Sequence, residues 1–159
     1  MSRSSLSLPF LLAGIAACEE REPYVDKCEN IAAAVESDGL AVAKDTRNKC
    51  DGEIENCAEV LGAQVYSVYA ASDAAFTHCD SSWGKNVDGT QVDPELGSYD
   101  PEENADWTRA ACDAVAQSAM QAAAVCHETA SDEDCNPVVG GAYGSAQQAC
   151  LDYYNLDSL

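Results

Sequence analysis

The spacing of the cysteines constrains the fold of this chain more than any other feature of its sequence. Eight of the nine cysteines form two groups of four, namely Cys28, Cys50, Cys57 and Cys79, then Cys112, Cys126, Cys135 and Cys150. The long intervals are 22 and 22 residues in the first group (28 to 50, 57 to 79) and 14 and 15 in the second (112 to 126, 135 to 150). Matched intervals on either side of a short turn are what two antiparallel helices need if disulfides bridge both ends of the pair.

Helical geometry agrees with this interpretation. At about 1.5 Å per residue, both intervals of the first group advance roughly 33 Å, so their ends stay level. At about 100° per residue, intervals of 22 and 14 residues return within about 40° of the starting face, and 15 residues within about 60°. Many pairings of eight cysteines exist, and the alternative is that some bridges join the two halves. The symmetry favours a nested set, namely Cys28–Cys79 outside Cys50–Cys57 and Cys112–Cys150 outside Cys126–Cys135.

Hydrophobic residues recur every three or four positions in all four intervals, which is typical of helices with one buried face. The predicted core-facing residues are Tyr24, Cys28, Ile31, Val35 and Val42; Ile54, Cys57, Leu61, Val65, Val68, Ala75 or Phe76, and Cys79; Trp107, Ala111, Val115, Ala119, Ala122 and Cys126; and Val139, Tyr143, Ala146, Cys150 and Tyr153. Residues 36–39 (Glu-Ser-Asp-Gly) interrupt the first interval, and we expect a kink or a split of the helix there. No convincing run alternates in the manner of a β-strand.

Composition predicts a thin core that disulfides reinforce. Ala supplies 27 of the 159 residues and aromatic residues only 7%. The tyrosines that we expect to pack on the bundle, with their hydroxyls in water, are Tyr66, Tyr69, Tyr143, Tyr153 and Tyr154. The expected fold class is all-α, with two disulfide-clamped antiparallel helical hairpins (24–79 and 105–159) forming a four-helix bundle or a loosely joined pair. Residues 80–104 form an acidic connecting loop that contains Gly and Pro.

The first 17 residues have the pattern of a cleavable export signal. Arg3 is the only charged residue among them, and residues 6–17 are mostly apolar and end in small side chains. As a helix this stretch spans about 18 Å, which is too short for a bilayer core of about 30 Å. We therefore expect residues 1–17 to be removed from the mature protein.

The end of this segment, Ile15-Ala16-Ala17-Cys18, resembles the lipobox of bacterial lipoproteins, in which an aliphatic residue and two small residues precede a cysteine. The resemblance implies that the Cys18 thiol carries a diacylglycerol and that residues 18–23 tether the domain to a membrane. An even number of cysteines, eight, then remains for disulfides. Glu19, where enteric lipoproteins of the inner membrane have Asp, favours the outer membrane. The alternatives are ordinary secretion, with cleavage at Ala16 or Ala17 and a free Cys18, and a segment that is not cleaved.

The formal net charge is −20, from 28 Asp and Glu against 8 Lys and Arg. This charge argues against nucleic acids and anionic membrane surfaces as electrostatic partners. It reflects either a solvated surface suited to a saline habitat or the binding of cations. The candidate ligands for a hard cation such as Ca²⁺ are Asp88, Asp93, Glu95 and Asp100, although the order of ligands in an EF-hand is absent.

Catalytic and cofactor motifs are scarce in this sequence. The two histidines, His78 and His127, each neighbour a cysteine and are expected to be polar residues at helix ends. The sequence has no zinc-type or haem-type cysteine spacing, no C-x-x-C pair and no glycine-rich phosphate loop. We therefore expect no cofactor and no enzymatic activity.

The sequence thus predicts a non-enzymatic structural or binding module at the bacterial cell envelope. A lipid anchor attaches it to the membrane, and its partner is a protein at the cell surface or in the periplasm. One alternative is an exported protein that binds or sequesters calcium or transition metals through the acidic loop or through reduced cysteines. Another is a secreted interaction or inhibitor module.

Overall fold

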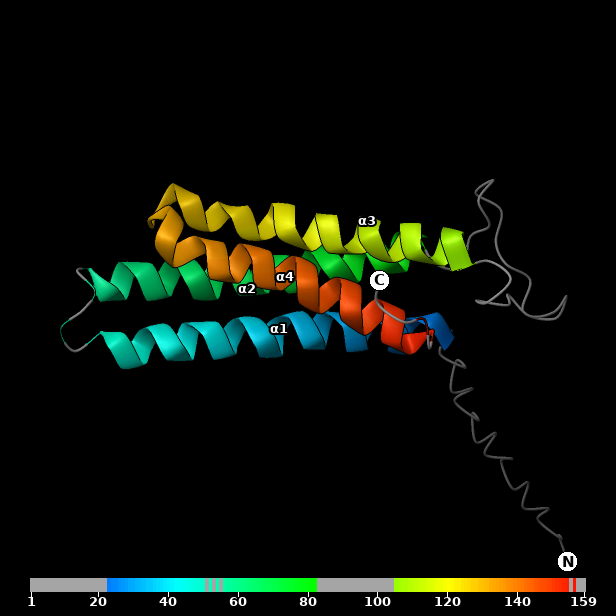
Figure 1. Ribbon diagram of the computed structural model, residues 1–159, viewed down its shortest axis with the longest axis horizontal. Helices are drawn as coiled ribbons and strands as arrows, with labels where there is room; N and C mark the ends of the chain where they lie inside the picture. The colour runs from blue at the N-terminus through cyan, green and yellow to red at the C-terminus, as the bar shows by residue number, and fades with distance from the viewer. Residues whose placement is uncertain are drawn as a thin grey trace, which may run out of the picture.

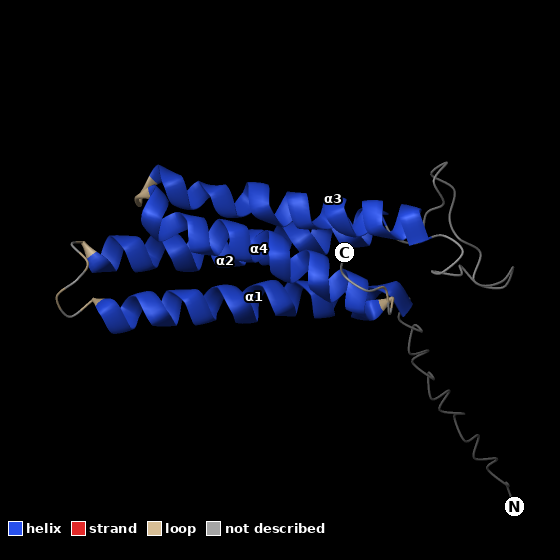
Figure 2. Cartoon of the chain, in the orientation of Figure 1, coloured by secondary structure: helices blue, strands red, loops and turns tan. Residues whose placement is uncertain are grey.

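A computed structural model of the chain describes residues 23–50, 52, 54, 56–82, 105–154 and 156. Within these ranges four helices lie side by side and no strand occurs (Figures 1 and 2). They are α1 (Pro23–Lys49), α2 (Cys57–Ser82), α3 (Ala105–Ala123) and α4 (Asp132–Tyr153), and a short 3-10 helix, η1 (Ala124–Glu128), continues α3. Each helix packs antiparallel on the next, and α4 packs on α1, which completes an up-down-up-down bundle.

One hydrophobic core runs through all four helices, so the two hairpins form a single bundle rather than a loosely joined pair. Ile31, Ala75, Val115 and Ala146 come from α1, α2, α3 and α4 in turn, and each is fully buried in the same cluster. Alanine supplies much of this core, with Ala71, Ala75, Ala116, Ala119, Ala123, Ala142 and Ala146 among its members. Such small side chains allow helix axes to approach closely. The all-α prediction is confirmed.

Four disulfides hold the bundle together. They pair the cysteines in the nested pattern that the spacing favours, namely Cys28–Cys79, Cys50–Cys57, Cys112–Cys150 and Cys126–Cys135. The two outer bridges belong to one core cluster at the end of the bundle where α1 begins and α4 ends, which we call the proximal end. The two inner bridges close the helical turns at the opposite, distal end. The prediction of disulfide-clamped hairpins is therefore confirmed.

The first hairpin is longer than the second, and the distal ends of α1 and α2 extend beyond the turn between α3 and α4 (Figure 1). α1 and α2 have 27 and 26 residues, whereas α3 and α4 have 19 and 22. α2 continues to Ser82, so residues 80–82, which were expected in the loop, are helical. Gln64 of α2 donates a hydrogen bond of 2.8 Å from Nε2 to the carbonyl of Asp134, which joins the two hairpins near the distal end.

Local polar groups define the turns at the distal end. Ser131 lies in extended backbone before α4, and its Oγ accepts a hydrogen bond of 3.3 Å from the N–H of Asp134. The first turn of α4 carries three acidic residues, which complement the positive end of the helix dipole.

Gly52, between α1 and α2, has a φ of 151°, a conformation that favours glycine. Pro137, expected at the start of α4, lies in its second turn.

The interruption expected at residues 36–39 is absent, because α1 is one continuous helix through this segment. Gly39 is buried at the contact with α2, where a Cβ would lie only 2.5 Å from Cγ2 of Val68. Asp38 accepts a hydrogen bond of 2.8 Å from the Ser145 hydroxyl of α4. The segment that resembles a helix break is therefore a close contact between helices, and glycine is the residue that permits it.

The predicted core face of α4 is displaced by one position in the first half of the helix, whereas Ala146 and Cys150 are buried as predicted. The buried residues of α4 are Cys135, Val138, Ala142, Ala146, Cys150 and Leu151. Val139 and Tyr143, which were predicted to face the core, are half-buried. Tyr153 is 46% exposed, whereas Tyr154 is buried. The closely spaced helices accept small side chains in the core and leave the larger ones toward its edge.

Removing the disulfides one at a time is expected to destabilise the bundle according to the loop that each closes. The outer pairs span 51 and 38 residues, so replacing both cysteines by Ala should cost about 4 kcal/mol for each pair. The inner pairs span 7 and 9 residues, and their removal should cost about 2.5 kcal/mol. Denaturant unfolding followed by circular dichroism measures these losses. Larger losses for the inner pairs than for the outer pairs would contradict the prediction.

Gly39→Ala is expected to lower the free energy of unfolding by about 1–3 kcal/mol, because the added methyl group meets Val68. Gly62→Ala provides the matched control, since nothing lies within 4 Å of a Cβ at that helical position. It should stabilise the protein by about 0.5–1 kcal/mol through helix propensity. Adding Val68→Ala to Gly39→Ala should cost less than the sum of the two single changes. Additive losses would show that the two residues do not meet.

Candidate functional site

The proximal end of the bundle holds a buried lysine between two aromatic rings. Lys27 of α1 is 7% exposed, and its Nζ donates a hydrogen bond to the hydroxyl of Tyr154. Nζ lies 4.3 Å from the ring centroid of Tyr154 and 4.7 Å from that of Tyr153. The N–H groups of Tyr154 and Leu156 both donate to the carbonyl of Leu151, which turns the chain back after α4. Lys27 therefore fastens this turn to the start of α1.

Burial lowers the pKa of Lys27 from its ordinary value of 10.5 to about 7. The cause is loss of hydration, which penalises the charged ammonium. The two tyrosine rings lie within cation–π distance of the ammonium, an interaction that favours its charged form. Near neutral pH the charge at the proximal end is consequently sensitive to pH.

A second polar cluster joins α3 to α4. Tyr143 donates a hydrogen bond to Oδ1 of Asp113, and Gln147 donates one of 2.9 Å to the Tyr143 hydroxyl. Gln117 donates one of 2.6 Å to Oδ2 of Asp113. The hydrogen bond to Asp113, followed by burial, raises the pKa of Tyr143, because ionisation would place two anions against each other. The cluster therefore holds its tyrosine protonated and bridges the two helices of the second hairpin.

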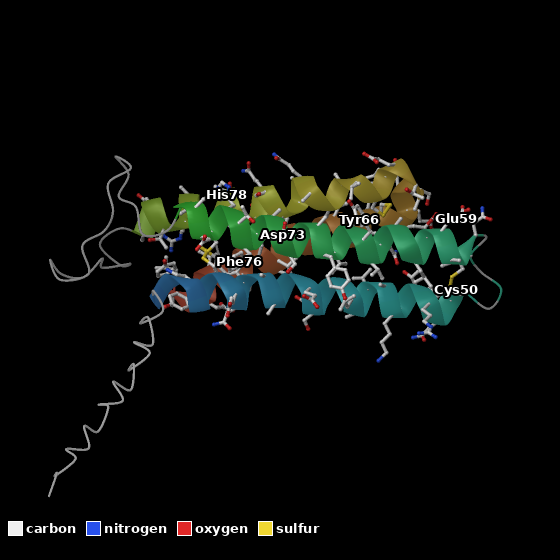
Figure 3. The ribbon with its side chains drawn as sticks, turned by 180° about the vertical axis from the view of Figure 1, so that it is seen from behind. Cys50, Glu59, Tyr66, Asp73, Phe76 and His78 are labelled. Carbon is white, nitrogen blue, oxygen red and sulfur yellow. A yellow bond between two sulfur atoms is a disulfide. The ribbon has the colours of Figure 1, made fainter. Side chains whose placement is uncertain are left out.

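Three of the five tyrosines expected to pack on the bundle are exposed instead. Tyr66 and Tyr69 of α2 are 66% and 51% exposed, and Tyr153 is 46% exposed. Figure 3 shows Tyr66 on the outer side of the first hairpin, with its ring extending toward α1. The prediction was wrong here because helical spacing alone does not reveal how little room the alanine-rich contacts leave for a ring. The exposed pair on α2 is a surface feature that sequence reasoning missed.

The two histidines lie near opposite ends of the bundle, His78 close to the end of α2 and His127 in η1. Nδ1 of His127 lies 2.9 Å from Oδ1 of Asp132, at the turn before α4. Among the residues that the structure describes, no group of three or more His, Cys, Asp or Glu is placed to hold a metal ion. The eight cysteines of the bundle are all bonded to one another, so their thiols are not available as metal ligands.

Two sets of predicted site residues lie outside the described ranges. They are the candidate lipidation site, Cys18, and the candidate calcium ligands, Asp88, Asp93, Glu95 and Asp100. Both therefore remain predictions from the sequence. Over the described ranges, no helix combines the length and the apolar character needed to cross a membrane.

The fold and its bridges define a class of protein, the all-α four-helix bundle made of two disulfide-clamped hairpins. A lysine held between aromatic rings distinguishes its proximal end. Comparison with known proteins adds no narrower assignment, because no family model, curated protein or solved structure matches the chain.

Lys27→Met is expected to remove a pH dependence of stability. Between the folded pKa of about 7 and the ordinary value of 10.5, the unfolded chain binds a proton that the folded chain releases. The free energy of unfolding therefore rises with pH in this window, by at most about 1.4 kcal/mol per pH unit. Urea unfolding between about pH 6.5 and 9.5 should show this rise for the natural protein and not for Lys27→Met.

Lys44→Met is the control for this experiment, because it removes an exposed lysine from the same helix. Its stability should rise with pH as steeply as that of the natural protein. Identical pH profiles for Lys27→Met and the natural protein would contradict the lowered pKa of Lys27.

Proposed function

We propose that the protein is an exported lipoprotein whose bundle is held at the cell envelope by acyl chains on Cys18. The proposal rests on how the nine cysteines are distributed between disulfides and the lipobox-like sequence. Eight of them are bonded in four pairs within the bundle, and the ninth is the cysteine of the lipobox-like sequence. Disulfides persist in compartments outside the reducing cytosol. An unpaired cysteine in such a compartment is a liability unless it is modified, and acylation is the modification that its neighbours indicate.

The position of the helices suits an anchor of this kind. Cys18 lies five residues before Pro23 (23 − 18), where α1 begins. Two acyl chains give stable membrane attachment, whereas one gives only marginal binding. The 27 residues of α1 then extend about 40 Å away from the point of attachment. A bundle closed by disulfides at both ends acts as a rigid module over that distance.

We assign a structural or binding role rather than an enzymatic one. Several titratable groups that form side-chain contacts in the bundle connect neighbouring elements. Lys27 holds the turn after α4, Asp113 bridges α3 to α4, and His127 contacts Asp132 across the last turn. These three groups therefore have structural roles, since each contact stabilises the packing of the elements that it joins. The partner of such a module is a protein at the cell surface or in the periplasm, and Glu19 favours attachment to the outer membrane.

Mass spectrometry of the protein from the producing bacterium tests the proposal. The expected mature chain begins at Cys18 and carries a diacylglyceryl group on that thiol, and no free thiol reacts with an alkylating agent before reduction. Cys18→Ser should move the protein from the membrane fraction to the soluble fraction while the helical circular dichroism is retained.

The double variant Cys50→Ser/Cys57→Ser is the matched control, since it removes a disulfide and leaves the anchor. It should remain in the membrane fraction. Natural protein that has an unmodified Cys18, or that is released into the medium, would contradict the lipoprotein and support the secreted alternative.

A further inference from the structure

The outer face of the first hairpin carries aromatic residues that the bundle does not use. Tyr66 and Tyr69 lie three residues apart on α2, and more than half of each side chain is exposed. At that spacing on a helix, Cβ atoms are about 5–6 Å apart, so the two rings are neighbours. Gly62 lies one turn before Tyr66, and nothing is within 4 Å of a Cβ at that position. The surface next to the rings is therefore open.

The register of α1 and α2 indicates which residues of α1 border these rings. Gly39 lies against Val68, and Ser72 donates a hydrogen bond of 3.0 Å to the carbonyl of Ala32. An antiparallel pair with this register places the stretch of α1 that contains Glu36 and Leu40 alongside Tyr66 and Tyr69. On α2 itself, Asp73 follows Tyr69 by one turn and is exposed (Figure 3). We call Glu36, Leu40, Tyr66, Tyr69 and Asp73 the tyrosine strip.

The charge around the tyrosine strip is negative. α2 contains no Lys or Arg, and its acidic residues are Glu59, Asp73 and Asp80. On α1, Lys27 is buried at the proximal end and Lys44 lies one turn beyond Leu40. Arg47 and Lys49 lie in the last turn, where Lys49 pairs with Asp45. The chain as a whole has a formal net charge of −20. Such a field attracts cations and repels nucleic acids, anionic lipids and acidic polysaccharides.

We propose that the tyrosine strip is a docking surface for a lysine- and arginine-rich segment of another protein. An ammonium or guanidinium group is attracted to the face of an aromatic ring, and more strongly where carboxylates stand nearby. The strip offers two rings and two carboxylates, with Glu36 on the adjoining stretch of α1 and Asp73 one turn after Tyr69 on α2. This charge complementarity selects a cationic partner over a neutral one.

The spacing of the rings also indicates the conformation of the partner. Alternate residues of an extended peptide point to the same side and lie about 6.5–7 Å apart. That separation is close to the distance between the two ring-bearing positions on α2. A segment with a basic residue at every second position therefore places successive cations on Tyr66 and Tyr69. The inference names a partner for the binding role proposed above, and the surface itself does not require the lipid anchor.

Binding of a defined peptide tests the proposal. The probe is a fluorescein-labelled dodecapeptide of alternating Arg and Gly, added to full-length protein in a non-ionic detergent, with affinity read by fluorescence anisotropy. The salt concentration is about 0.15 M, where screening beyond about 8 Å suppresses diffuse attraction. Tyr66→Ser/Tyr69→Ser, which leaves the charge unchanged, should weaken binding about tenfold. Tyr66→Phe/Tyr69→Phe, which keeps both rings, should bind like the natural protein.

Tyr153→Ser is the matched control, because it removes an exposed tyrosine at the proximal end of α4. It should leave the affinity unchanged, and circular dichroism checks that every variant folds. Equal affinity of Tyr66→Ser/Tyr69→Ser and the natural protein would mean that only diffuse charge attracts the peptide, and would overturn the proposal. Binding of a neutral proline-rich peptide or a neutral oligosaccharide through the two tyrosines, without binding of the cationic peptide, would overturn it as well.

The same assay on Cys18→Ser separates this proposal from the lipid anchor. Unchanged peptide affinity in that variant is the expected result, because the tyrosine strip lies on the bundle. A failed lipid assignment would then leave the docking surface intact, and a failed docking assay would leave the lipid assignment intact. Loss of peptide binding in folded Cys18→Ser would show that the peptide is held near the anchor and would overturn the proposed surface.

Discussion

The covalent closure of each hairpin at both ends is the constraint on which the rest of this structure depends. An alanine-rich core buries little apolar area per residue, so hydrophobic burial alone is weak for a chain of this charge. The bridges act mainly on the unfolded chain, whose freedom they restrict. The two longest closed loops, Cys28–Cys79 and Cys112–Cys150, meet in one core cluster. The same cluster therefore holds both hairpins closed where they also pack against each other.

Close helix packing follows from this arrangement and determines where larger side chains lie. Gly39 against Val68 shows how little space separates α1 from α2. Fully buried alanines such as Ala71 and Ala119 show the same restriction elsewhere in the core. A tyrosine ring does not fit such a contact, so Tyr66 and Tyr69 are placed on the outer surface. The exposed aromatic pair is thus a direct consequence of a core built from small residues.

The fold was largely predictable from the sequence because cysteine spacing carries long-range information. Two equal intervals of 22 residues specify a hairpin length, a register and a facing side at once. Hydrophobic periodicity was less informative, because alanine appears on both faces of these helices and gives little contrast. The predicted face of α4 therefore included Val139 and Tyr143, whereas the neighbouring Val138 and Ala142 occupy the core. Gly39 was misread for a related reason, since a glycine at a close contact has the same sequence signature as a helix break.

The tyrosine strip was harder to predict than the fold, because it depends on which side chains are too large for the core. Tyr66 sits 16 residues before Ser82 (82 − 66), so it lies about 24 Å along the bundle from the proximal end. In the proposed orientation, with Cys18 in the membrane, that distance is several times the Debye length of about 8 Å at physiological salt. A surface charge on the membrane is screened at that height, and a cationic partner is attracted by the bundle itself. The acidic charge then has two compatible effects. It repels the bundle from an anionic membrane surface. On the outer face of the first hairpin, it also attracts cations to the tyrosine strip, where they can contact aromatic rings.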